Sequence, residues 1–134
     1  MPPRRFTVDE ANRLIPRLEM LIERLQRAAR TVRGAIDRGE IGPEVRTTTD
    51  VARAHPQLTP EVREMESVML EIEQLGCQFK GLDLGLVDFL GELDGRPVLL
   101  CWQYGEKSIG FWHAIDEGFA GRRPFPTGAV PRLQ

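Results

Sequence analysis

Cysteine, histidine, lysine and tyrosine are all scarce in this chain of 134 residues. The two cysteines, Cys77 and Cys101, have no Cys-x-x-Cys spacing, which excludes a zinc knuckle and a disulfide framework and predicts reduced thiols. The sequence also lacks a run of about 18 apolar residues, and its first residues lack the apolar core of a signal peptide. We therefore expect a cytoplasmic protein that does not associate with membranes.

A strong charge of either sign is also missing. The net charge is −2 and no dense basic cluster is present, so we expect no binding to nucleic acid. The charge is unevenly divided, with eleven arginines against eight acids in residues 1–58 and seven basic residues against twelve acids in residues 59–134. This division favours association between the two halves or between copies of the chain.

The clearest local signal that is present is the start of a helix. Thr7 and Glu10 have the spacing of a capping box, in which each side chain bonds the backbone of the other. An apolar seam with alternating steps of three and four then follows: Ala11, Leu14, Leu18, Leu21, Leu25, Ala28, Val32 and Ile36. The pattern predicts a helix over residues 7–38 that is kinked near Pro16.

A second helix is predicted over residues 59–75, because Thr59 can cap it, Pro60 suits its first position and Gly76 can end it. The intervening residues 39–58 contain two prolines and no sustained period, which predicts a long mobile loop. Two apolar stripes joined by a loop favour an antiparallel helical hairpin. Its seam resembles that of a coiled coil and predicts a homodimer with a four-helix interface.

Beyond Gly76 the apolar residues alternate, as they do in strands. Asp94-Gly95 suits a two-residue type I′ turn, which fixes the register so that Asp88 faces Cys101. Alternation then sorts the hairpin into two faces. One face is wholly apolar, with Val87, Phe89, Val98, Leu100 and Trp102. The other mixes polar groups with leucines and contains Leu86, Asp88, Leu90, Leu99, Cys101 and Gln103.

A third strand should return over residues 108–113, and its register has two solutions. A two-residue loop places His113 opposite Leu100, whereas a three-residue loop places it opposite Cys101 and in a row with Asp88. The fold class predicted is α+β, a single domain over residues 1–134 with a long antiparallel helical hairpin packed on a small three-stranded antiparallel meander. The meander and a closing loop occupy residues 77–124, and residues 125–134 form a tail.

Several motifs occur together in the order Phe6–Pro16 (FTVDEANRLIP), Gly76 with Lys80, Gly85–Phe89 (GLVDF), Asp94-Gly95, Leu100–Trp102 (LCW), Gly105-Glu106, Trp112-His113 and Gly118–Pro124 (GFAGRRP). As a set, they resemble the bacterial domain of unknown function 2203 family over nearly the whole chain. That family is uncharacterised, so the resemblance implies no activity, cofactor or catalytic residue.

The candidate site consists of Asp88, Cys101, Glu106 and His113, with Asp116 nearby in the sequence. A carboxylate, a thiolate and an imidazole can bind a divalent transition metal. The same groups can form an activated thiol, with histidine as the base and aspartate orienting it. Both hypotheses require the three-residue loop that places His113 opposite Cys101.

A purely structural interpretation competes with the site. Buried acids need partners, so Asp88 is expected to pair with Arg122 or Arg123 while Cys101 and His113 fill the core. On this interpretation, which the frequency of such residues in cores favours, the protein is a small non-catalytic interaction or scaffold protein that dimerises through its helices. The alternative is a metal- or thiol-dependent enzyme or sensor that uses Asp88, Cys101 and His113.

A third possibility is a small-ligand-binding module. Gln103, Trp102, Trp112, Arg122 and Arg123 are the residues that could line its pocket. Aromatic residues at alternating strand positions are more often part of a core, and this competes with the ligand-binding interpretation.

Overall fold

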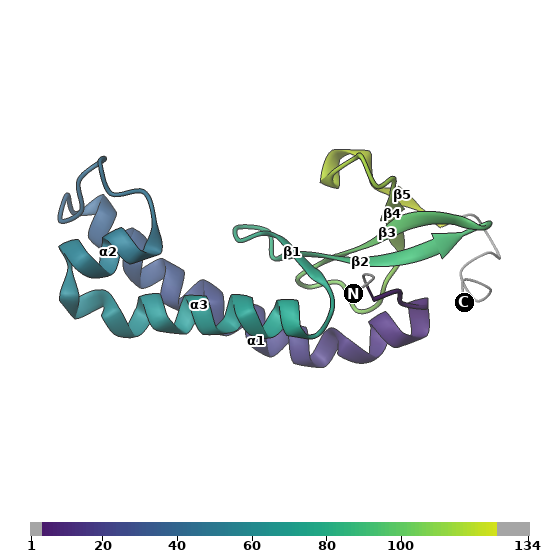
Figure 1. The fold of residues 1–134 in the computed structure, drawn as a ribbon, viewed down its shortest axis with the longest axis horizontal. Coiled ribbons are helices and arrows are strands. Elements are labelled where there is room, and N and C mark those ends of the chain that lie inside the picture. Colours follow the sequence, from purple (N-terminus) through teal and green to yellow (C-terminus); the bar gives the residue numbers. More distant parts are fainter. Residues whose placement is uncertain (1–3, 126–134) are drawn as a thin grey trace.

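The structure, a computed structural model, describes residues 4–125. One long helix, α1 (Val8–Asp37), runs along one side of an elongated molecule (Figure 1). The short helix α2 (Thr48–Ala54) and the 3₁₀ turn η1 (Pro56–Leu58) lie at its C-terminal end, and helix α3 (Thr59–Gln74) runs back beside it. The sheet lies over its N-terminal end and contains β1 (Gln78–Gly81), β2 (Leu86–Leu93), β3 (Arg96–Gln103), β4 (Phe111–His113) and β5 (Arg123–Pro124). A second 3₁₀ turn, η2 (Phe119–Gly121), precedes β5.

Helix α1 starts at the predicted capping box. The backbone N–H of Glu10 donates to Thr7 Oγ1 at 3.0 Å, and that of Thr7 donates to Glu10 Oε1 at 2.8 Å. These two bonds satisfy N–H groups that the first helical turn leaves without partners. Pro16 lies inside the helix without splitting it, so α1 is one continuous element of 30 residues.

Helix α3 packs beside α1 in the opposite direction. Arg24 pairs with Glu64, and Arg17, seven residues earlier, pairs with Glu71, seven residues later, which requires antiparallel axes. The arrangement is less simple than the predicted hairpin, because α3 accompanies only part of α1, and α2 and η1 lie between them in the sequence. Residues 39–58, predicted as a mobile loop, contain these two elements and contribute to a small second apolar cluster formed by Ala35, Ile41, Val51, Leu58 and Val62.

The fold is α+β, as predicted, but the prediction of three strands was wrong. The sheet has five antiparallel strands in the order β1-β2-β3-β4-β5. The two outer strands were not predicted because their own residues carry little strand pattern. The sequence of β1, Gln-Phe-Lys-Gly, is short and mostly polar, and β5 has only two residues, one of them proline. Such short edge strands carry little period and depend on pairing with the strand beside them.

The central hairpin has the predicted turn and register. Asp94 and Gly95 both have positive φ, 52° and 78°, as a type I′ turn requires. Asp88 is paired with Cys101 and Val87 with Trp102. The apolar face packs into the main core with residues of α1 and α3, and Val87, Phe89 and Trp102 are completely buried. The opposite face is therefore turned away from the helices.

Most of the apolar seam of α1 is buried within the single chain. Leu18, Leu21 and Leu25 are completely inaccessible, whereas Ile36 near the C-terminal end of the helix is 49% exposed. The buried part of the seam gives no independent reason for a second copy to bind, and the homodimer stays a prediction. None of the helices within residues 4–125 combines the length and apolar character needed to cross a membrane. The predicted tail starts at Phe125, which is buried, and otherwise lies outside the described residues.

Candidate metal centre

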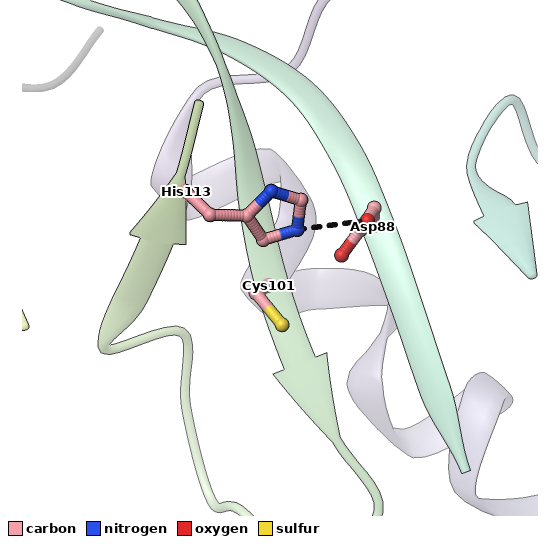
Figure 2. A group of neighbouring side chains, drawn as sticks. All are labelled: Asp88, Cys101 and His113. Atoms are coloured by element: carbon pink, nitrogen blue, oxygen red, sulfur yellow. Dashed lines mark hydrogen bonds and ion pairs between the residues drawn. The ribbon is translucent and has the colours of Figure 1, made fainter. Parts of the chain in front are cut away.

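Three polar side chains meet on the face of the sheet that is turned away from the helices. Asp88 comes from β2, Cys101 from β3 and His113 from β4, so three adjacent strands each contribute one group (Figure 2). One carboxylate oxygen, the thiol sulfur and one ring nitrogen all lie within 4.8 Å of one another. The three residues are 3%, 1% and 1% exposed, respectively. The cluster is therefore both close enough and buried enough to act as a unit.

Neither predicted register of β4 is observed. His113 is paired with Leu99, which lies one position before the Leu100 predicted from a two-residue loop and two positions before Cys101 in β3. A shift of two residues preserves the face of the sheet, so His113 still lies on the same face as Cys101, as a diagonal neighbour. The reason is that residues 104–110 form a long connection, which replaces the tight turn assumed from the sequence. The cluster thus forms in a third register, different from both of those predicted from the sequence.

Hydrogen bonds define which nitrogen of His113 carries a proton. Its Nδ1 lies 2.9 Å from the carbonyl oxygen of Ala114, which can only accept, so Nδ1 is the donor. Nε2 lies 3.0 Å from Oδ2 of Asp88. Metal-binding histidines usually donate one ring N–H to a backbone carbonyl or carboxylate in this way, which leaves the other nitrogen free to face the metal. The imidazole is consequently held with Nε2 aimed into the cluster.

The electrostatics of the cluster disfavour an activated thiol. Burial, followed by the neighbouring Asp88 carboxylate, raises the pKa of Cys101 to about 12. Burial also raises the pKa of Asp88, although His113, Cys101 and Lys80 each oppose this effect. A cysteine nucleophile needs a base that can take its proton, yet the two nitrogens of His113 are engaged by Ala114 and Asp88. In this arrangement Cys101 remains a protonated thiol unless a metal displaces its proton.

A cavity of about 220 Å³ opens onto the cluster. Its other walls come from Lys80 and Leu86 on one side and from the segment Glu117–Phe119 on the other. Lys80, Glu117 and Phe119 are site residues that the sequence did not predict. The only available signal was the placement of Lys80 and of Gly118–Pro124 within the family motifs, because neither segment lies beside Asp88 in the sequence.

The other predicted site residues lie outside the cluster. Glu106 pairs with Arg122 through both carboxylate oxygens, at 2.8 and 2.9 Å. The guanidinium of Arg122 also stacks over Phe111, 4.0 Å from the ring centroid. Arg123 pairs in the same bidentate way with Glu117, at 2.8 and 2.9 Å. Thus the expected pairing of Asp88 with Arg122 or Arg123 was wrong, because both arginines bind other acids.

Three more predicted residues have structural contacts. Trp102 is completely buried in the main core, and its indole N–H donates to the carbonyl of Glu106 at 3.0 Å. Trp112 packs against the same core beneath the guanidinium of Arg123. The backbone N–H of Gln103 donates to Glu106 at 2.7 Å. None of these residues, nor Arg122 or Arg123, lines the cavity over Asp88, Cys101 and His113.

The two arginine pairs explain how the outer face is covered. Residues 114–122, which we call the strap, cross this face between β4 and β5. Arg122 fixes one end by binding Glu106 and the carbonyl oxygen of Cys101, the latter at 3.2 Å. Within the strap, Glu117 accepts from the backbone N–H of Ala114 at 3.0 Å as well as from Arg123. The strap shields the cluster from water without filling the cavity.

The donor set matches the chemistry of a zinc site with three protein ligands. Zinc accepts carboxylate oxygen, thiolate sulfur and imidazole nitrogen at roughly 2.0–2.3 Å, which places the ligand atoms of a tetrahedron roughly 3.3–3.8 Å apart. The separation of 3.0 Å between Asp88 and His113, and the upper bound of 4.8 Å for the cluster, lie close to these spacings. A fourth position would face the cavity.

Comparison with protein-family models gives one match, described as an uncharacterized conserved protein (DUF2203), over residues 4–125. A search of curated proteins found no match. A search of solved structures also found none. The matched region includes every residue of the cluster, both arginine pairs and the helical part of the fold. Because the family model spans nearly the whole chain, the protein belongs to the DUF2203 family.

Proposed function

We propose that this protein binds one divalent transition-metal ion, with zinc preferred, through Asp88, Cys101 and His113. The observation that carries the proposal is the convergence of three different ligand types from three strands at one buried point. A fourth coordination position that opens into a cavity is typical of catalytic or ligand-binding zinc sites, whereas structural zinc sites are closed by four protein ligands. The centre is therefore a place where the metal meets an exchangeable ligand.

The burial of the cluster supports a functional role over a structural one. Polar groups buried in a protein usually cost stability unless their hydrogen bonds are complete, and an apolar replacement is often at least as stable. If the outer face needed only to be buried, leucine could occupy all three positions of the cluster, as Leu99 does on the same face. A retained acid, thiol and imidazole, with the imidazole oriented by a carbonyl, fits metal coordination better.

A non-catalytic scaffold role with a homodimer remains a second proposal. Its original basis, a surplus apolar seam, is weakened because the seam packs within the chain. Exposed apolar side chains do remain on the helices, including Met20 at 57% and Leu70 at 56%. Single exposed apolar residues are common on monomers, so they favour no particular partner.

The direct test is metal analysis of the purified protein, followed by zinc titration of the protein after chelation. We expect one zinc ion per chain. Cys101→Ser and His113→Gln should each weaken zinc binding by more than about 100-fold, since losing even a residue that only supports a ligand costs about 10–100-fold. Cobalt substitution should add a thiolate-to-cobalt absorption band that Cys101→Ser removes.

Cys77→Ser is the matched control, because Cys77 is equally buried but lies in the main core and donates to the carbonyl of Ile72. It should keep both the zinc stoichiometry and the cobalt band. Glu106→Gln should also keep them, since Glu106 binds Arg122 and not the cluster. Zinc binding that is absent in the wild-type protein, or that survives in both Cys101→Ser and His113→Gln, would refute the proposal.

A further inference from the structure

The cavity over the cluster has one cationic wall. Lys80 lines it, and no ion pair within residues 4–125 involves Lys80. Lys80 lies two positions after Gln78 in β1, and Gln78 pairs with Asp88, so the alternation of the strand gives Lys80 the same face as the cluster. Lys80 is exposed, yet close enough to lower the pKa of Asp88 by its charge.

The charges around the cavity favour an occupant with a single negative charge. A bound divalent ion would be neutralised by the Asp88 carboxylate and the Cys101 thiolate. The carboxylate of Glu117 is already paired with Arg123 through both oxygens. The ammonium of Lys80 is then the remaining charge that faces the cavity. One uncompensated cation next to a metal with an open position attracts a monoanion.

The size and the remaining walls restrict the occupant further. A volume of about 220 Å³ holds roughly seven groups of the size of water. Leu86 and Phe119 provide apolar surface beside the charged wall, and Phe119 is 37% exposed at the opening. A small occupant with a charged end and a short apolar body satisfies both kinds of wall.

Building on the proposed metal centre, we infer that its open position takes a small monocarboxylate. One carboxylate oxygen binds the metal and the other accepts a hydrogen bond from the ammonium of Lys80. The short carbon chain lies against Leu86 and Phe119. Carboxylates fit this role because their two oxygens can bridge a metal and an ammonium group, whereas neutral amides and imidazoles bring no negative charge to pair with Lys80.

The experiment uses the full chain loaded with cobalt, whose visible absorption reports changes in coordination. Acetate and propionate are titrated into the wild-type protein, Lys80→Met and Lys107→Met. Lys107 is the only other lysine and is exposed away from the cavity, so it is the matched control. We expect saturable spectral changes, with propionate binding more tightly than acetate. The dissociation constant should rise about 10–100-fold in Lys80→Met and stay within about twofold in Lys107→Met.

Acetamide, imidazole and inorganic phosphate are titrated in parallel. Equal dissociation constants for propionate in the wild type and Lys80→Met would overturn this inference, as would tighter binding of acetamide, imidazole or phosphate. In those cases the cobalt spectrum still reports a loaded site, and the metal proposal stands. A wild-type protein that binds no cobalt would instead overturn the proposed metal centre, and this inference with it.

Discussion

The two faces of the β2–β3 hairpin are equally buried at their centres, but different structures cover them. On the apolar face, Phe89 and Trp102 are completely inaccessible beneath the helices. On the other face, Asp88 and Cys101 are 3% and 1% exposed beneath the strap. The helices present a continuous apolar stripe that packs closely against the first face. The strap is irregular and leaves a cavity above the second face.

With the proposed metal centre, this difference separates residues that stabilise the fold from residues that bind the metal within one pair of strands. The side chains of the core face fill the space between the sheet and the helices, so changes in their size or shape cost stability. The outer face instead presents a carboxylate, a thiol and an imidazole, with a cavity of about 220 Å³ above them. Substitutions on the two faces should therefore have opposite signatures: loss of stability on one, and loss of metal binding on the other.

The largest effect on stability is expected for Phe89→Ala. The side chain is completely buried and its ring contacts that of Phe6 edge to face, with centroids 5.1 Å apart. Removing it should lower the free energy of unfolding by about 3–5 kcal/mol, measured by urea denaturation. Any folded fraction should still bind zinc with unchanged stoichiometry. A loss below about 1 kcal/mol would show that the core face is not the stabilising one.

A smaller loss of about 1–3 kcal/mol is expected for Arg122→Met. The change leaves the partly buried Glu106 and the carbonyl of Cys101 without their charged partner, while keeping an apolar chain over Phe111. The loosened strap should also let a thiol reagent reach Cys101 in the metal-free protein faster than in the wild type.

Arg24→Ala is the matched control for Arg122→Met. It also removes an arginine that pairs with a glutamate, here through two nitrogens at 3.1 and 2.7 Å, but the pair with Glu64 is more exposed than that of Arg122 with Glu106. The loss of stability should stay below about 1 kcal/mol and the reactivity of Cys101 should not change. Equal thiol reactivity in both variants would contradict the role assigned to the strap.

The pH dependence of stability should reveal the burial of Asp88 in the metal-free protein. Burial raises the pKa of this carboxyl above its ordinary value of 3.8. Its protonated form therefore stabilises the folded state fully below that value, and this contribution is lost as pH rises through the raised pKa. Relative to Asp88→Asn, the free energy of unfolding of the wild type should fall as the pH rises above 3.8, measured by denaturation in a chelator. A difference that rises with pH would contradict this assignment.

The smallest effect on stability is expected for the double replacement Asp88→Leu with His113→Leu. Replacing both members of a buried polar pair by apolar groups is often neutral or stabilising. We expect the metal-free protein to change by less than about 1 kcal/mol or to gain stability, with zinc binding abolished. A loss of more than about 3 kcal/mol would mean that the pair is a structural element, and the contrast between the two faces would disappear.

Some elements of this fold could be predicted because they depend only on residues that are close in the sequence. The capping box of Thr7 and Glu10, the length of α1 and the type I′ turn at Asp94-Gly95 are local features, and each lies where the sequence predicts it. The turn also fixed the pairing of Asp88 with Cys101, because a two-residue loop leaves no freedom in register. Two of the three cluster residues could therefore be placed beside each other in advance.

The rest required the tertiary structure. The connection of residues 104–110 set the register of β4, and no local rule predicts the path of so long a loop. Lys80, which is 33 residues from His113 in the sequence, reaches the same cavity because the short edge strand β1 pairs with β2. The partners of Arg122 and Arg123 were mispredicted for the same reason, since several acids lie within reach and only the path of the strap selects among them. Thus the sequence by itself determined which chemical groups are present and, through alternation, on which face of a strand each lies. Long-range packing decided which of these groups come into contact.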